Sequence, residues 1–208
     1  MKKKKKENGI GFTSFFSLKG GVGKTSLASA ISLELAYINQ KVPVITNDPI
    51  SPLEEILGAE NALLIQPDQT FPNTLKTNDD VLVDLGGFVD ERSIPVLEQS
   101  KTIVVPTLGS FLSLSGLIGT LQEVEKFNKE IIIVLNRVDK KEEEKVRTFI
   151  KENADYPIFS LKTSKCFENI HYQKKSVAQM MEEEPLRRRS YDGVSKQIWE
   201  IINYLQEK

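Results

Sequence analysis

Residues 11–25 have the sequence GFTSFFSLKGGVGKT. A short apolar run, Gly11–Leu18, leads into closely spaced glycines, and Thr25–Ile38 then repeats apolar residues at the spacing of a helix. Glycines let the backbone turn tightly and point its N–H groups inward. A helix that begins near Lys24 adds the positive end of its dipole. This order of strand, glycine loop and helix predicts an anion-binding loop.

The loop matches the P-loop pattern G-x-x-x-x-G-K-[ST] except at its first position, where Leu18 replaces glycine. In a P-loop, Lys24 reaches the β- and γ-phosphates of a nucleotide and the Thr25 hydroxyl holds Mg²⁺. The alternative is a glycine-rich turn that binds nothing, which the flanking strand and helix disfavour. The expected nucleotide-binding residues of this loop are Gly20, Gly21, Val22, Gly23, Lys24, Thr25 and Ser26.

A second motif supports the same site. Asp84 ends the apolar run Val81–Val83 and is followed by Gly86-Gly87. An isolated aspartate at the end of a strand is commonly a turn residue or a helix cap, but beside a P-loop this arrangement is typical of the acid that binds Mg²⁺ through water. We therefore expect ATP and Mg²⁺ as ligands and ATP hydrolysis as the activity.

The bulk composition resembles that of an ordinary soluble protein. The 208 residues carry a formal net charge of −1, so any contact with nucleic acid has to come from local basic clusters. One cysteine, Cys166, excludes a disulfide framework within the chain, and no apolar run approaches the ~20 residues that span a bilayer. Lys2–Lys6 is not followed by the apolar core of a signal peptide. These features predict a cytoplasmic protein with a basic mobile tail at 1–8 and a single domain at 9–208.

Apolar strand-like segments alternate with helix-like segments, which predicts right-handed βαβ units. The apolar runs are continuous, so the strands are expected to be buried on both faces. The predicted fold is α/β, a P-loop NTPase with a mostly parallel twisted sheet and helices on both faces. The predicted strands are Gly11–Leu18, Val42–Ile45, Val81–Val83, Thr102–Val105, Ile131–Leu135 and Pro157–Leu161. The predicted helices are Thr25–Ile38, Pro52–Leu57, Phe111–Phe127, Lys140–Lys151 and a C-terminal helix marked by Val194, Ile198, Ile201, Ile202 and Leu205.

Lys19 makes the loop more specific. A lysine just before the two glycines, in KGGVGKT, resembles the deviant Walker A motif of the ParA/MinD family of dimerising ATPases. The segment Thr46–Pro49 resembles the D-x-D-P segment of that family, and Val83–Gly87 resembles its switch II. Ile131–Asp139 resembles the strand whose asparagine reads adenine. The short spacing between these motifs is most similar to that of the small ParA proteins of plasmid partition.

The resemblance implies a role for each matching residue. Lys19 would cross a dimer interface to the phosphates held by the partner, where a second cation stabilises the transferring phosphoryl group. Asp48 would position the attacking water and support Mg²⁺ together with Thr25 and Asp84. The implied catalytic residues are Lys19, Lys24, Asp48 and Asp84, and the implied adenine site holds Asn136 and Arg137. Two positions depart from the family: Thr46 replaces its first aspartate, and Ile50 replaces the glutamine that often follows Asp-Pro.

The resemblance also implies a biological role, DNA partition in the bacterial cytoplasm, in association with the nucleoid. An ATP-bound homodimer would bind DNA nonspecifically, and a centromere-binding ParB-like adaptor would trigger hydrolysis and release. Nonspecific DNA binding needs cations that contact phosphate. The candidates are Lys174, Lys175, Arg187, Arg188 and Arg189, although Glu182–Glu184 lies just upstream of the arginines and such charge runs are commonly solvated faces.

Three alternative functions stay open. A MinD-like, membrane-associated positioning ATPase would need a C-terminal amphipathic helix that is free to leave the protein; the last helix is expected to pack in the core, so no stable membrane anchor is predicted. An ATP-dependent metabolic enzyme, resembling dethiobiotin synthetase, would not need Lys19. A nucleotide-binding regulator that barely hydrolyses ATP is compatible with the departures at Thr46 and Ile50.

Overall fold

The computed structural model describes residues 9–72, 79–87 and 91–208; the predicted mobile tail, 1–8, lies outside these residues. The described strands form one seven-stranded sheet with the order β3-β2-β4-β1-β5-β6-β7, and every recorded strand pair is parallel. The strands are β1 (Phe12–Phe15), β2 (Val44–Thr46), β3 (Ala62–Leu64), β4 (Val81–Asp84), β5 (Thr102–Leu108), β6 (Glu130–Val138) and β7 (Ile158–Lys162).

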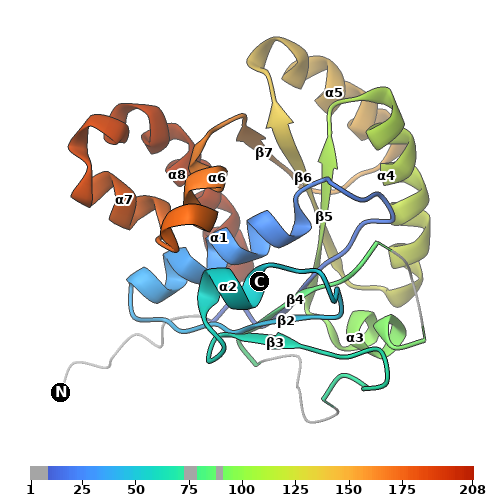
Figure 1. The fold of residues 1–208 in the computed structure, drawn as a ribbon. Helices are drawn as coiled ribbons and strands as arrows, with labels where there is room; N and C mark the ends of the chain where they lie inside the picture. The colour runs from blue at the N-terminus through green and yellow to red at the C-terminus, as the bar shows by residue number, and fades with distance from the viewer. Residues whose placement is uncertain (1–8, 73–78, 88–90) are drawn as a thin grey trace, which may run out of the picture.

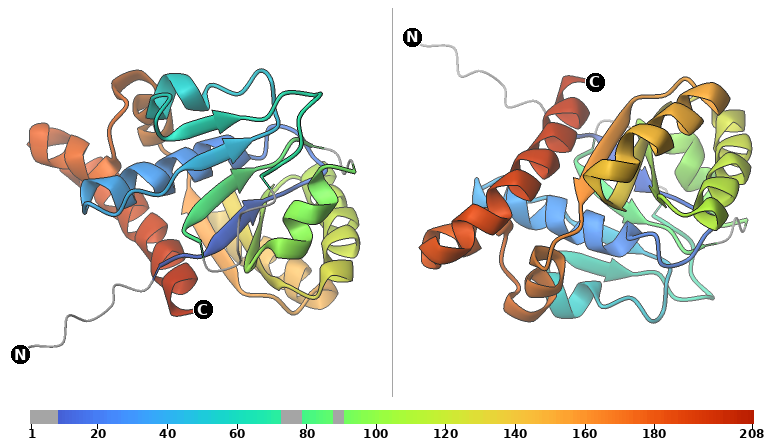
Figure 2. Two further views of the ribbon diagram at one scale, coloured as in Figure 1. Left: turned by 90° about the horizontal axis from the view of Figure 1, so that it is seen from below. Right: turned by 90° about the horizontal axis from the view of Figure 1, so that it is seen from above.

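Helices cover both faces of this sheet (Figures 1 and 2). One face packs against α1 (Lys24–Tyr37), α2 (Leu53–Leu57), α6 (Cys166–Gln173), α7 (Val177–Glu183) and α8 (Pro185–Glu207), whose buried residues form one hydrophobic cluster. The other face packs against α3 (Ser93–Gln99), α4 (Phe111–Val124) and α5 (Lys140–Asn153), which contribute to a second cluster. A short 3₁₀ turn, Glu125–Phe127, follows α4. The predicted α/β fold, with a parallel sheet and helices on both faces, is confirmed.

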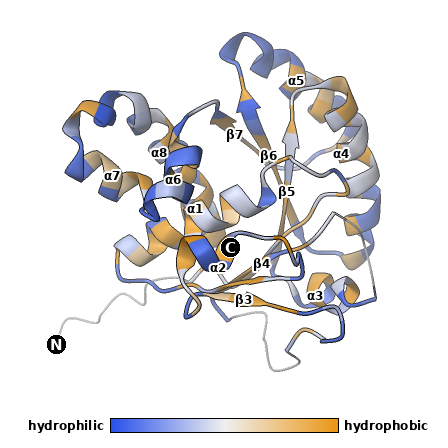
Figure 3. Ribbon diagram, viewed as in Figure 1, coloured by the Kyte–Doolittle hydropathy of each residue, from blue (hydrophilic) through white to orange (hydrophobic). Residues whose placement is uncertain are grey.

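The continuous apolar runs account for this architecture. In β6, the residues Ile131–Leu135 are each at most 3% exposed, and they alternate between the two clusters because successive side chains point to opposite faces. Figure 3 shows the same hydrophobic character along the strands of the sheet. Strands of this kind need cover on both faces, which a parallel sheet with crossover helices provides.

The structure adds elements that the sequence patterns did not predict, namely β3, α3, α6 and α7. They have between three and eight residues, too few for a period of 3.6 or 2 to become visible. The strand β5 also continues past Val105, through Pro106, to Leu108. Proline is tolerated there because β5 pairs with β1 only as far as Val104, and beyond that residue it pairs on the β6 side.

The last helix, α8, packs in the core. Its residues Val194, Ile198, Ile201, Ile202 and Leu205 are fully buried in the cluster that includes α1. This confirms the prediction that the terminal helix packs against the protein. Among the described residues, no helix has the length and apolar character that crossing a membrane requires.

Candidate nucleotide-binding site

The predicted site residues follow strands that end at one edge of the sheet. Asp84, the last residue of β4, is in register with Phe15 of β1 on one side and with Thr46 of β2 on the other. The loops that leave these three strands therefore begin side by side. In parallel α/β sheets, ligands bind outside this carboxyl edge.

The loop between β1 and α1 has the backbone that its glycines allow. Gly21 has φ +75° and Gly23, the N-cap of α1, has φ +98°, both in the left-handed region that favours glycine. A Cβ atom at Gly20 or Gly21 would meet no atom within 4 Å, so these two residues leave their surroundings open. Lys24 is half-buried and its Nζ donates to the backbone oxygen of Ser17 at 3.3 Å. The lysine thus folds back over the loop that precedes it.

Thr25 and Asp84 form the centre of the candidate metal site. The Thr25 hydroxyl donates to Oδ2 of Asp84 at 2.6 Å. Asp84 is 1% exposed, and its Oδ1 is buried without a hydrogen-bond partner. Burial raises the pKa of Asp84 to about 6, against the opposing effects of the Thr25 hydrogen bond and the Lys24 charge. An unpartnered carboxylate oxygen beside a hydroxyl suits a hard cation such as Mg²⁺, so these residues fit the metal that the P-loop pattern implies.

Burial and nearby acids act on Lys24 in opposite directions. Burial lowers the pKa of its ammonium, while the charges of Asp84 and Asp48 raise it. Both carboxylates therefore lie close enough to Lys24 for their charges to act on its ammonium. An anion that binds beside Lys24 together with a cation suits this arrangement, because the cation offsets the negative charges of the two carboxylates.

The loop after β2 is tied to the loop after β4. The Gly86 N–H donates to Oδ1 of Asn47 at 2.8 Å. In the next residue, the Asp48 N–H donates to the Thr46 hydroxyl at 3.1 Å, and the Ile50 N–H donates to Oδ1 of Asp48 at 3.1 Å. Thr46 therefore holds the backbone at Asp48, although it cannot supply the carboxylate that resembling proteins have at its position. The side chain of Asn47, which the sequence did not single out, thus links the segment Thr46–Pro49 to the predicted switch II segment, Val83–Gly87.

The first part of the loop rests on α4. The Leu18 N–H donates to the Thr120 hydroxyl at 3.1 Å. A Cβ atom at Gly116 would lie 3.5 Å from Cβ of Lys19 and 3.7 Å from its Cδ. Lys19 therefore extends along α4, whereas Lys24 folds over its own loop. The sequence did not indicate Thr120 or Gly116, because their contacts join segments about a hundred residues apart.

Asn136 lies against the loop from the other side. Its Nδ2 donates to the backbone oxygen of Val22 at 2.9 Å, and its Oδ1 is buried without a partner. Arg137, the next residue, is exposed and has φ +52°. A cavity of about 450 Å³ opens beside them. It is lined by Ser26, Arg137, Thr163, Ser164, Lys165, Phe167, Glu168 and His171.

The predicted basic residues gather around α7. Lys174 is the C-cap that follows α6, Lys175 pairs with Glu183 at the far end of α7, and Arg187 pairs with Glu184 at 2.6 Å at the start of α8. Figure 1 shows α7 next to the beginning of α8, at one side of the molecule. The structure thus brings the two clusters to one region, where Lys174, Arg188 and Arg189 are exposed. Lys175 and Arg187 are partly neutralised by their acidic partners.

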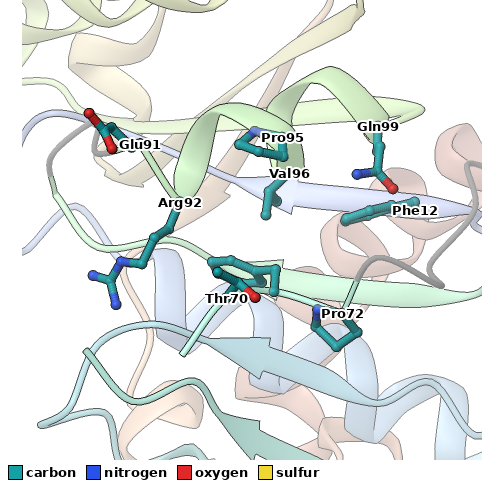
Figure 4. A pocket seen from close by; sticks show the side chains of 9 residues that line it. Phe12, Thr70, Pro72, Glu91, Arg92, Pro95, Val96 and Gln99 are labelled. Atoms are coloured by element: carbon teal, nitrogen blue, oxygen red, sulfur yellow. The ribbon is translucent and has the colours of Figure 1, made fainter. Parts of the chain in front are cut away.

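A second cavity, of about 300 Å³, lies apart from the P-loop (Figure 4). It is bounded by Phe12 at the start of β1, by residues 70–72 and by α3. Figure 4 shows Val96 and Pro95 of α3 to the left of Phe12. None of the residues lining this cavity belongs to the predicted nucleotide site: they are Phe12, Thr70, Phe71, Pro72, Glu91, Arg92, Pro95, Val96 and Gln99.

Comparison with known proteins gives a family and a fold. Residues 13–186 match the family model described as the CobQ/CobB/MinD/ParA nucleotide binding domain. No curated protein sequence matches the chain.

Solved structures with the same fold include three at low sequence identity. MinD of Aquifex aeolicus superposes with a TM-score of 0.68 at 16% identity, covering 94% of this chain and 96% of that one. A putative plasmid partition protein of Borrelia burgdorferi B31 bound to AMPPNP gives 0.67 at 16% identity, with coverage of 94% and 98%. The septum site-determining protein MinD of Pyrococcus horikoshii OT3 with Mg-ADP gives 0.66 at 16% identity, with coverage of 91% and 94%.

Proposed function

Because the chain belongs to the CobQ/CobB/MinD/ParA nucleotide-binding domain family, we propose that it is a Mg²⁺-dependent ATPase of the ParA type that acts in DNA partition. The ATPase proposal rests mainly on the buried Thr25–Asp84 pair beside Lys24, because Oδ1 of Asp84 is an unpartnered oxygen next to a hydroxyl. The proposed domain is the single unit 9–208. The proposed location is the cytoplasm of a bacterial cell, on the nucleoid.

Each residue of the site has a distinct task. The N–H groups of Gly20–Gly23 and the ammonium of Lys24 bind the β- and γ-phosphates. Thr25 and Asp84 hold Mg²⁺, which when bound neutralises charge on the phosphates. Asp48 orients the attacking water from its place beside Lys24. Hydrolysis is expected to be slow, because no strong general base is evident near the loop among the residues that the structure describes.

Asn136 favours adenine among the bases. One of its N–H groups is already used on the Val22 carbonyl, so Oδ1 is the acceptor left for a ligand. The exocyclic amine of adenine is a donor, whereas guanine has a carbonyl oxygen at the equivalent position. The cavity beside Ser26 and Arg137 has room for the base.

The proposed active form is an ATP-bound homodimer. The side chain of Lys19 extends along α4, whereas that of Lys24 folds over the loop, which supports a role for Lys19 toward a second subunit rather than toward the phosphates beside Lys24. In the dimer, Lys19 of each copy would stabilise charge on the nucleotide of the other. A ParB-like, centromere-binding adaptor would accelerate hydrolysis and so release the dimer.

The proposed DNA surface is the region around α7. Lys174, Arg188 and Arg189 are exposed there, and dimerisation would double their number. A MinD-like association with membranes has less support. Releasing α8 as an amphipathic anchor would expose Val194, Ile198 and the other fully buried residues of its inner face.

The test is binding to random-sequence duplex DNA at two salt concentrations, with ATP, with ADP and without nucleotide. Binding that requires ATP and falls steeply with salt is expected. The double variant Arg188→Glu/Arg189→Glu should lose DNA binding and keep nucleotide binding, and Lys126→Glu, an exposed lysine on the opposite face of the sheet, is the matched control. If the wild type binds no DNA in any nucleotide state, the partition proposal is wrong, while ATP hydrolysis that disappears in Asp84→Asn would still support the ATPase.

A further inference from the structure

The outer surface of α4 lacks the charges that a surface helix normally carries. Its sequence, FLSLSGLIGTLQEV, has no charged residue before Glu123. Phe111 is 80% exposed and Leu112 is 71% exposed, and Ser115 is exposed one turn later. We call Phe111, Leu112 and Ser115 the α4 patch. An ordinary surface helix places polar and charged residues on such a face.

The patch is not needed for the core of the subunit. The inner side of α4 is formed by the buried residues Ser113, Leu114, Leu117, Thr120, Leu121 and Val124. The neighbouring α5, on the same face of the sheet, has the usual pattern, with Val146 and Ile150 buried and charged residues outside. Two adjacent, large hydrophobic side chains exposed at the start of α4 therefore indicate a surface that a partner covers.

The patch lies next to Lys19. The loop residues Leu18 and Lys19 rest on Gly119 and Gly116 of α4, because a Cβ at those glycines would lie 3.9 Å from the Leu18 side chain and 3.5 Å from Cβ of Lys19. The α4 patch begins about one turn before Gly116, at the N-terminal end of α4, which directly follows β5. It is thus at the carboxyl edge of the sheet, where a third exposed hydrophobic residue, Ile50, is 88% exposed.

We propose that the α4 patch is a contact surface of the ATP-bound dimer and is covered by a second copy of this chain. The inference rests on the proposed function, because Lys19 reaches a partner's nucleotide only if the carboxyl edges of two copies face each other. A surface beside Lys19 is then covered by the same partner.

The composition of the patch suits a second copy. In a two-fold symmetric dimer, surfaces near the axis meet their own equivalents. A charged surface would repel itself in that position, whereas Phe111 and Leu112 bury apolar area against a like surface. The small, exposed side chain of Ser115 allows the partner to approach the helix closely.

The first experiment measures dimerisation by sedimentation velocity with Mg²⁺ and a non-hydrolysable ATP analogue. The double variant Phe111→Ser/Leu112→Ser should bind the analogue with wild-type affinity, since neither residue lines the site. Its dimer should be weaker by a factor of about 100, as expected for the loss of two apolar anchors. Ile38→Ser is the control, because Ile38 is an exposed hydrophobic residue, 43% exposed, at the opposite end of α1 from the P-loop.

The second experiment locates the interface directly. Cys166, the one cysteine of the sequence, is fully buried, so a Ser115→Cys variant presents a single reactive thiol to a bifunctional maleimide. Cross-linked dimers should form with the ATP analogue and not with ADP, and Ile38→Cys should form none. The inference is overturned if the Phe111→Ser/Leu112→Ser variant dimerises like the wild type. It is also overturned if Ser115→Cys does not cross-link while the protein is dimeric. Either outcome leaves the proposed dimer intact. A wild type that stays monomeric with the analogue overturns both the proposed dimer and the inference about the α4 patch. Binding of a different protein to the patch under those conditions would also contradict the inference.

Discussion

Replacing Gly23 by alanine tests the geometry of the P-loop where it is tightest. Gly23 has φ +98°, and a Cβ atom at this position would lie 2.1 Å from Nδ2 of Asn136. The variant Gly23→Ala therefore strains the backbone and displaces the asparagine. Gly20→Ala is the matched control within the same loop, because a Cβ there would meet nothing within 4 Å and its φ is outside the left-handed region.

The expected cost can be worked from these contacts. An alanine in the left-handed region costs about 1–2 kcal/mol, and losing the Asn136–Val22 hydrogen bond costs about 1 kcal/mol. Alanine also restricts the unfolded chain, which returns about 0.5 kcal/mol. Gly23→Ala should therefore lower the free energy of unfolding by about 2 kcal/mol, whereas Gly20→Ala should leave it unchanged or raise it slightly.

The assay is urea unfolding at equilibrium without nucleotide, so that phosphate binding does not contribute. Asn136→Ala and the double variant Gly23→Ala/Asn136→Ala complete a cycle. Because the steric overlap involves Asn136, the double variant should be more stable than the sum of the two single effects predicts. The reasoning is refuted if Gly20→Ala and Gly23→Ala are equally stable, or if the two single effects simply add.

Three further predictions concern other contacts. Asn47→Ala leaves the buried Gly86 N–H without its acceptor and should lower the free energy of unfolding by about 1–2 kcal/mol; an unchanged urea midpoint would contradict the link between the two loops. Burial raises the pKa of Glu34 despite hydrogen bonds from Ala178, Val177 and Trp199, so the native state keeps this proton to higher pH than the unfolded chain. The stability of the wild type relative to Glu34→Gln should therefore fall as pH rises above the ordinary carboxyl range. Urea unfolding between about pH 4 and pH 8 measures this difference in stability, and a flat or rising difference would refute the prediction. Burial raises the pKa of the Cys166 thiol to about 11, so the native protein should react with a thiol reagent at neutral pH no faster than it unfolds, and rapid labelling would show that the thiol is accessible.

The sequence predicted the features that depend on local patterns. Continuous apolar runs identified buried parallel strands such as Ile131–Leu135, because burial on both faces leaves no room for polar alternation. The glycines before Lys24 identified the phosphate loop, because only glycine readily takes the φ values found at Gly21 and Gly23. The position of Asp84 at a strand end also followed from the apolar residues before it.

Other parts of the fold gave too little local signal. The three residues of β3 and the short helices α3, α6 and α7 show no period that a sequence pattern could reveal. The strand β3 forms because it pairs with β2, and the three helices pack against elements distant in the chain, α3 against β1 and both α6 and α7 against α1. The two basic clusters were visible in the sequence, but the pairing of Lys175 with Glu183, across the length of α7, was not.

The amino-acid sequence by itself thus determined the strand–loop–helix unit, the parallel α/β class and the types of residue at the phosphate site, because each depends on neighbours along the chain. Only the tertiary structure decided which of these residues meet. The strand order places Asp84 between Phe15 and Thr46, and the packing of distant segments joins Asn47 to Gly86, Asn136 to Val22 and Lys19 to α4. These contacts depend on how the whole sheet and its helices pack, and no local pattern records that.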